Sequence, residues 1–241
     1  MTDQNGPDDD KVTRFPDARE REALEKAHIV HHTPAREPFL NLPPVVQILC
    51  LLNIAVFLCG KFFPQLLTDD LLYALAFVPA RYFGADPIGG AAIFSPVTYM
   101  FIHGGWMHLS LNVAMLMAFG AGLEKFMGGR RLLLLYFATG LCGAMAQLLV
   151  YPHTDSPMIG ASGGISGLFG GVMIMMYSSG MLGQGYRKLL PVIFIWIGIS
   201  VFFGFFGMPG VDSPIAWTAH VGGFIGGLLL YGPISRLKIQ H

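Results

Sequence analysis

Six long apolar runs follow a polar N-terminal segment in this 241-residue chain. A helix needs about 20 predominantly apolar residues to cross a bilayer, so each run predicts a membrane span. The pattern therefore predicts an all-α polytopic membrane protein, a bundle of six transmembrane helices. The predicted spans are residues 43–60, 97–120, 132–151, 159–178, 189–207 and 214–232.

The runs divide the chain into three parts: a polar tail at residues 1–42, a membrane domain at 43–235 and a short end at 236–241. The tail has no apolar core of a secretory signal, and its acidic residues do not suit a mitochondrial transit peptide. It holds one expected short helix near residues 17–28. Within the membrane domain, residues 61–96 form a loop too apolar to be simply solvated, and they predict an interfacial helix pair in the outer leaflet.

Composition agrees with a membrane protein, and charge placement orients it. Only 12% of residues are charged, against about 25% in soluble domains. With the N-terminus inside, 13 of the 15 Lys and Arg residues fall in cytoplasmic segments, and only Lys61 and Arg81 fall outside. Cytoplasmic loops carry the basic excess, so both termini are expected in the cytoplasm, with a bacterial inner membrane as the expected location. The zero net charge gives no support for a nucleic-acid partner.

Cysteines and clustered histidines give no sign of a metal or cofactor. Cys50, Cys59 and Cys142 all lie in apolar runs and lack CxxC spacing, which predicts neither a disulfide framework nor a zinc site. The histidines at positions 28, 31 and 32 have no fixed scaffold and no fourth ligand. We therefore expect no metal and no cofactor.

The candidate chemistry lies inside the predicted spans, where ionisable side chains are costly and indicate function. His103 and His108 are near the start of the second span, His220 is in the sixth, and Ser162 opens the fourth within a glycine-dense segment. These three spans all enter from the outside in the charge-derived orientation. His108 is expected a third to halfway along its span, and Ser162 and His220 within the first two turns of theirs. The site is therefore expected in the outer half of the bilayer.

Spacing assigns each group a possible part in acyl chemistry. His108 and Asn112 are four residues apart and share one helix face, so their N–H groups suit an oxyanion hole. Ser162 needs a base to accept its proton, and His220 is the one ionisable base in the sixth span. Small-residue stripes permit close helix contact in membranes, and packing of two such stripes would bring Ser162 and His220 together. The stripes are Gly163, Gly167 and Gly171 in the fourth span, and the pairs Gly222/Gly226 and Gly223/Gly227 in the sixth.

Three motifs, in the expected spans and order, together resemble the rhomboid intramembrane serine proteases. They are GxSG at residues 160–163, HxxxxHxxxN at 103–112 and AHxxGxxxG at 219–227. The resemblance implies a Ser–His dyad without a catalytic acid, and cleavage of transmembrane segments of protein substrates near their outer ends. It also implies the following roles: Ser162 as nucleophile, His220 as general base, His108 and Asn112 with the Ser162 N–H as oxyanion donors, and His103, Gly160, Gly163, Gly223 and Gly227 as supporting residues.

The sequence departs from the rhomboid pattern at one position beside the site. Many rhomboids carry an aromatic residue four positions after the serine, stacked on the base, whereas this chain has Ser166. A Trp-Arg pair of the first outside loop is also absent. Neither departure removes a reacting group, but Ser166 leaves the support of His220 open.

Other readings remain for comparison. GxSxG also marks the nucleophile elbow of α/β-hydrolases, which needs a preceding strand, and no HExxH metalloprotease motif occurs. The main competitor is a catalytically silent rhomboid-like protein that binds membrane helices. A multi-span transporter ranks below it, because the chain lacks paired broken helices.

Overall fold

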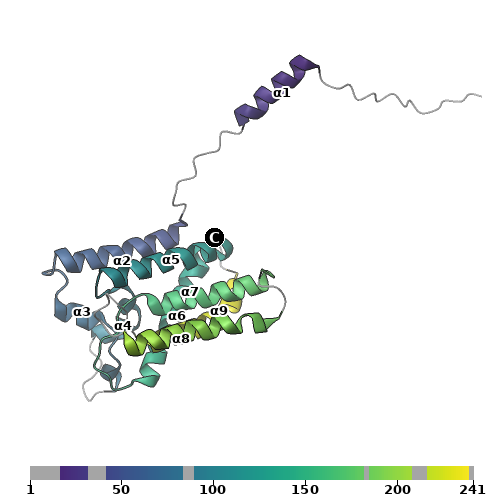
Figure 1. The fold of residues 1–241 in the computed structure, drawn as a ribbon. Coiled ribbons are helices and arrows are strands. Elements are labelled where there is room, and N and C mark those ends of the chain that lie inside the picture. Colours follow the sequence, from purple (N-terminus) through teal and green to yellow (C-terminus); the bar gives the residue numbers. More distant parts are fainter. Residues whose placement is uncertain (1–16, 32–41, 84–89, 182–184, 208–215, 239–241) are drawn as a thin grey trace, which may run out of the picture. The chain divides into compact units, whose positions relative to one another are not determined.

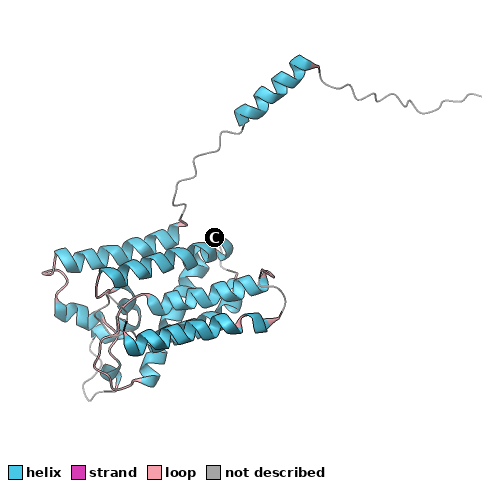
Figure 2. Ribbon diagram, viewed as in Figure 1, coloured by secondary structure: helices cyan, strands magenta, loops and turns pink. Residues whose placement is uncertain are grey.

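Helices make up nearly all of the regular structure in the computed structural model (Figure 2). The structure describes residues 17–31, 42–83, 90–181, 185–207 and 216–238. Within these residues the one β feature is an antiparallel bridge between Phe77 and Met158. The helices are α1 (Ala18–His31), α2 (Pro44–Phe62), α3 (Asp69–Leu75), η1 (Pro79–Tyr82), α4 (Gly90–Thr98), η2 (Tyr99–Phe101), α5 (Trp106–Met127), α6 (Gly129–Val150), α7 (Ser162–Ser178), η3 (Tyr186–Lys188), α8 (Leu190–Phe206) and α9 (Trp217–Ser235) (Figure 1).

Residues 1–41 are a unit separate from the rest of the chain, and α1 is its described helix. Asp17 begins this helix by accepting hydrogen bonds at 2.9 Å from the backbone N–H groups of Arg19 and Glu20. The Glu20 carboxylate in turn accepts from the Asp17 N–H at 3.0 Å. This reciprocal capping box satisfies donors that a helix start leaves free. The short helix predicted near residues 17–28 is confirmed.

All six predicted spans contain a helix: α2 and α5 to α9. The predicted start of the second span is wrong by nine residues, because residues 97–105 complete α4, form η2 and then continue as non-helical backbone to Gly105 before α5 begins at Trp106. The hydropathy pattern does not mark this break, which begins at Ile102, where the backbone is extended with ψ of 135°. By length and composition α2, α5 and α6 are each long and apolar enough to cross a membrane. The helices α7 and α8 have 17 residues each, and α9 has 19.

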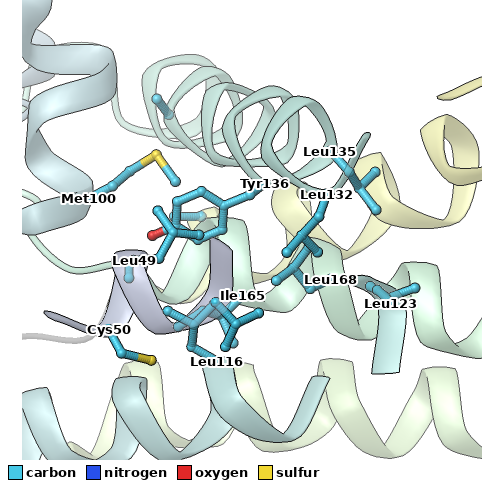
Figure 3. Close-up of a cluster of buried hydrophobic side chains, with 14 of the residues drawn as sticks. Leu49, Cys50, Met100, Leu116, Leu123, Leu132, Leu135, Tyr136, Ile165 and Leu168 are labelled. Carbon is cyan, nitrogen blue, oxygen red and sulfur yellow. The ribbon is translucent and has the colours of Figure 1, made fainter. Parts of the chain in front are cut away.

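Helix α7 lies at the centre of the membrane domain and packs against α5, α6 and α9. Its glycines and apolar residues are buried along most of its length. Figure 3 shows side chains from α2, η2, α5 and α6 gathered around α7, with Ile165 and Leu168 contributed by α7 itself. The serine at the start of α7 is therefore held by a helix that is fixed on several sides.

A buried carboxylate attaches α2 to α5. Glu124, near the end of α5, is buried, and its two oxygens accept hydrogen bonds from the backbone N–H groups of Val45 and Val46 at 3.0 and 2.8 Å. Those groups belong to the first turn of α2, which has free donors and a partial positive charge. The carboxylate thus caps α2 across the bundle.

The segment at 61–96 contains α3, η1 and the start of α4, so short helices occur where the interfacial pair was predicted. Arg81 holds the segment together: its guanidinium donates to the carbonyls of Tyr73, Ala74 and Ala76, and lies 4.3 Å from the Tyr73 ring centre. The position of the 61–96 segment relative to a bilayer stays a prediction.

Candidate active site

Ser162 and His220 meet where α7 and α9 begin. Ser162 is the first residue of α7 and His220 the fourth of α9. The Oγ of Ser162 and Nε2 of His220 are 2.8 Å apart, within hydrogen-bond distance, and both side chains are partly buried. A serine hydroxyl can donate its proton to a neutral imidazole nitrogen at this distance. The two residues named from sequence as nucleophile and base are thus brought together.

Glycines bring the two helices into backbone contact. A methyl group on Gly223 would collide with the carbonyl oxygen of Gly163, and one on Gly227 with that of Gly167. The opposite helix shows the same closeness, because a Cβ on Gly170 would lie 2.5 Å from the carbonyl of Phe224 in α9. The close contact expected from the stripes is present at Gly163 and Gly167, whereas a Cβ on Gly171 would meet only side chains, with Leu135 of α6 nearest at 3.1 Å. The contact begins at Gly163, next to Ser162. It holds α7 and α9 at the separation that brings Ser162 and His220 within hydrogen-bond distance.

The second glycine pair in α9 serves another neighbour. A Cβ on Gly222 or Gly226 would collide with Cys142 of α6, at 2.8 and 2.9 Å from its nearest atoms. Helix α9 therefore presents one glycine pair to α7 and the other to α6. Both contacts fix α9, and with it His220, against the centre of the bundle.

Gly160 places a histidine beside the serine. Its φ of +112° is a backbone conformation that residues with a side chain rarely adopt. A Cβ at this position would lie 2.6 Å from Nε2 of His108. Its N–H donates to the carbonyl of Tyr99 at 2.9 Å. Tyr99 is itself held by its hydroxyl, which donates to the Gly140 carbonyl of α6 at 2.8 Å. The first glycine of GxSG thus leaves room for His108 close to Ser162.

His108 lies in the first turn of α5, as its third residue. The expectation that it would lie a third to halfway along its span is wrong, because α5 begins later than the apolar run. One turn on, the Asn112 amide donates one N–H to the His108 carbonyl at 2.8 Å. An amide has two N–H groups, so the second remains for another acceptor, and both residues line the pocket that contains Ser162.

His103 precedes α5 and lies outside the helix to which the sequence assigned it. Its side chain is 7% exposed, and its ring meets the edge of the His108 ring with centroids 5.1 Å apart. It does not line the pocket that contains Ser162, but it borders a neighbouring one between α2 and α5. A supporting role, through packing against His108, stays a prediction.

The pocket beside Ser162 has a cavity volume of about 210 Å³ and lies between α5, α7, α8 and α9. Its walls are mainly apolar, with Leu111 and Met115 from α5 and Ile199 and Phe203 from α8. Ser162, His220, His108 and Asn112 all line this apolar cleft. A largely apolar cleft with a few convergent polar groups is the usual form of a ligand site.

Comparison with known proteins identifies the family. The Rhomboid domain family matches residues 91–236, which include every element that lines the pocket. The chain belongs to the rhomboid family. It is therefore an integral membrane protein with a helical membrane fold, from a family that acts on transmembrane substrates within the membrane.

Relatives of this rhomboid occur in plants and bacteria. This chain is 30% identical to RHOMBOID-like protein 5 of Arabidopsis thaliana over 145 residues. The matched residues cover 60% of this chain and 45% of that protein. It is 31% identical over 135 residues to the putative rhomboid protease YdcA of Bacillus subtilis, covering 56% and 63%. With the rhomboid protease GluP of the same bacterium it shares 32% over 142 residues, covering 59% and 26%. The matched part of the chain thus covers between 26% and 63% of the length of these relatives.

Sequence reasoning missed several residues of this rhomboid's pocket, above all Trp196 and Ser200 of α8. The available signal was weak. Trp196 and Ser200 are four residues apart in the otherwise apolar helix α8, so they share one face of it. Tyr99 was missed because its hydroxyl donates a hydrogen bond to a backbone carbonyl of α6. No spacing of residues in the sequence predicts such a contact.

Among the described residues, the hydrogen bond to Ser162 is the one that the His220 side chain makes, and no carboxylate lies on its other nitrogen. The described part of the chain likewise contains no group of three His, Cys, Asp or Glu side chains suited to a metal. The geometry of this rhomboid is that of a serine–histidine pair beside two further N–H donors.

Proposed function

We propose that this rhomboid is an intramembrane serine endopeptidase that cleaves transmembrane segments of membrane proteins with a Ser162–His220 dyad. The observation that carries the proposal is the 2.8 Å distance between Ser162 Oγ and His220 Nε2. The two residues are 58 positions apart and lie on separate helices. Packing alone does not require a hydroxyl and an imidazole at one helix contact, whereas nucleophilic catalysis does.

The reaction begins when the Ser162 oxygen attacks the scissile carbonyl carbon while its proton passes to Nε2 of His220. The tetrahedral intermediate collapses, the C–N bond breaks, and His220 gives the proton to the departing amine. A water molecule then attacks the acyl-enzyme while His220 accepts its proton; the ester C–O bond breaks, and His220 returns the proton to the Ser162 oxygen. Each step uses the same pair of atoms that lie 2.8 Å apart.

Three donors support the oxyanion in this proposal. The backbone N–H of Ser162 is in the first turn of α7, where it has no intrahelical acceptor and lies at the positive end of the helix dipole. The second N–H of Asn112 and the ring of His108 border the same pocket. Loss of one such donor typically costs about 2.7–4 kcal/mol of transition-state stabilisation.

The proposal includes six crossings, by α2 and α5 to α9, with both termini in the cytoplasm. Support comes from the 13 of 15 basic residues on one side of that topology. Fusions at the C-terminus test it. A green fluorescent protein there is expected to fluoresce and a phosphatase to be inactive; the reverse pattern would contradict the topology.

The experiment that tests the dyad uses the protein in membranes with a serine-reactive fluorophosphonate probe and a model transmembrane substrate. Wild type is expected to be labelled and to cleave. Ser162→Ala is expected to lose both, and His220→Ala to lose labelling because Ser162 then lacks its base. Ser178→Ala, at an exposed position of the last turn of α7, is the matched control and is expected to match wild type.

Two results would count against the proposal. Wild type that is never labelled and never cleaves would favour a catalytically silent rhomboid-like protein that binds membrane helices. Cleavage that persists in Ser162→Ala would place the nucleophile elsewhere.

A further inference from the structure

A second pocket lies between α2, α3 and the start of α5. Its cavity volume is about 190 Å³, and it is lined by the end of α2, by Leu72 of α3 and by residues 102–106. The rings of Phe57 and Trp106 meet edge to face with centroids 4.8 Å apart, which joins α2 to α5 here. None of the reaction steps proposed above uses a residue of this pocket.

His103 is a buried polar residue without a partner on the wall of this pocket. Its side chain is 7% exposed, and neither ring nitrogen has a hydrogen-bond partner among the described residues. Buried polar groups in native proteins nearly always have a partner from protein, water or ligand. An imidazole carries at least one N–H donor, so His103 has a donor for an acceptor that occupies the cavity.

The start of α5 adds further donors to the same pocket. Gly105 is the N-cap of this helix, and no side chain caps it. The first N–H groups of a helix have no intrahelical acceptor and carry a partial positive charge. Because Gly104, Gly105 and Trp106 line the pocket, the N-terminus of this 22-residue helix borders a cavity in which it would stabilise an anion.

Lys61 supplies a full positive charge. It lies in the last turn of α2, lines the pocket, and makes no hydrogen bond or ion pair with the described residues. Arg81, the other basic residue expected outside, already donates to three carbonyls. In the described part of the chain no Asp or Glu lines this pocket. An ammonium group, an imidazole and a helix N-terminus thus border one cavity that no acidic side chain lines.

The pocket also lies where a lipid headgroup would be. It forms where one apolar helix ends and another begins, and α2 and α5 are both long and apolar enough to cross a membrane. Trp106 is 54% exposed, and tryptophan is enriched at the boundary between hydrocarbon and headgroups. The remaining walls are apolar and suit the glycerol and upper acyl carbons of a lipid; they include Val56, Phe57, Leu72 and Ile102.

We propose that this pocket binds the phosphate group of a phospholipid from the membrane leaflet at this end of α2 and α5. Lys61 pairs with the phosphate, and His103 and the first N–H groups of α5 donate hydrogen bonds to its oxygens. Charge-assisted hydrogen bonds of this kind are about twice as strong as neutral ones. The site is separate from the pocket of Ser162, so lipid binding does not depend on the proposed function.

The test uses the full chain in micelles of a neutral, phosphate-free maltoside detergent. A trace of phosphatidylglycerol with a photoreactive diazirine high on one acyl chain is crosslinked, and the labelled residues are mapped by mass spectrometry. A diacylglycerol with the same chains and diazirine lacks only the phosphate headgroup and is the matched probe. Phosphatidylglycerol is expected to label residues 56–61 and 102–106 about tenfold more than diacylglycerol does, the effect of one hydrogen bond to a charged group.

Variants locate the phosphate. Lys61→Ala, at an exposed position, and His103→Phe are each expected to lower phosphatidylglycerol labelling of the pocket about tenfold. Lys61→Arg keeps the charge and is expected to keep the labelling. Lys125→Ala removes an exposed lysine from the last turn of α5, outside this pocket, and is expected to match wild type. The thermal unfolding midpoint reports whether each variant is folded, and if His103→Phe is not, Lys61→Ala decides alone.

Three results would overturn the proposal. Equal labelling of the pocket by the two probes would show that the phosphate is not recognised. Phosphatidylglycerol labelling that is unchanged in Lys61→Ala would show that any recognition occurs elsewhere. Excess inorganic phosphate is expected to leave the labelling unchanged, and if it abolishes labelling of the pocket, the occupant is free phosphate and not a lipid.

Discussion

Substitution of Gly160 by alanine is expected to disable the site with a single methyl group. The φ of +112° there is unfavourable for any residue with a Cβ and costs about 1–3 kcal/mol. The new Cβ would lie 2.6 Å from Nε2 and 2.8 Å from Cε1 of His108, whereas ordinary contact begins at 3.4 Å. The His108 ring would therefore have to move by about 0.8 Å. A misplacement of about 1 Å in an active site can cost about 100-fold in rate.

The assay is cleavage of a model transmembrane substrate in vesicles, together with the thermal unfolding midpoint. Gly160→Ala is expected to lower kcat/KM about 100-fold and the free energy of unfolding by about 1–3 kcal/mol. Gly122→Ala is the matched control, because a Cβ on that glycine of α5 meets nothing within 4 Å, and it is expected to retain activity. Cleavage by Gly160→Ala at more than half the wild-type rate would refute the reasoning, since His108 would then tolerate displacement.

Three further substitutions test separate parts of the structure. Asn112→Ala is expected to keep fluorophosphonate labelling but to lower kcat by about 100- to 1,000-fold; full activity would remove Asn112 from the oxyanion role. Glu124→Gln keeps the shape but loses the charge that accepts two N–H groups at the start of α2, and it is expected to lower the free energy of unfolding by about 1–3 kcal/mol, measured by denaturation in detergent; an unchanged midpoint would contradict the capping role. In Gly223→Ala the new Cβ would collide with the Gly163 carbonyl, so this variant is expected to lose both stability and labelling. A stable variant that is still labelled would show that α7 and α9 can move apart without loss of stability or activity.

Local sequence patterns predict most of the helices and part of the candidate site. The helices α2 and α6 to α9 could be predicted because an apolar run is a property of residues that follow one another in the chain. The start of α5 could not, since hydropathy is continuous across residues 97–105 and the break is a matter of backbone conformation. The Ser162–His220 pair could be predicted from the stripes. Trp196 and Ser200 could not, because the contact between α8 and the site is a tertiary one.

The length of α7 bears on how the site reaches water. Its 17 residues extend about 25 Å, which is shorter than the roughly 30 Å hydrocarbon core. In a helix that crosses as proposed, Ser162 would then lie about 5 Å below the hydrocarbon boundary, and the non-helical segment before it would also be at membrane depth.

Irregular backbone at that depth is tolerated only where protein satisfies its polar groups, and this segment meets the condition. Met158 exchanges two hydrogen bonds with Phe77, at 3.0 and 2.8 Å, and the Gly160 N–H reaches the Tyr99 carbonyl at 2.9 Å. Phe77, in the segment at 61–96, and Tyr99 of η2 thus contribute the backbone partners that would let α7 begin below the membrane surface. In the proposed topology, Ser162 at this depth would meet a transmembrane substrate inside the bilayer, and the start of α7 would lie within about 5 Å of the water that the second half of the reaction requires.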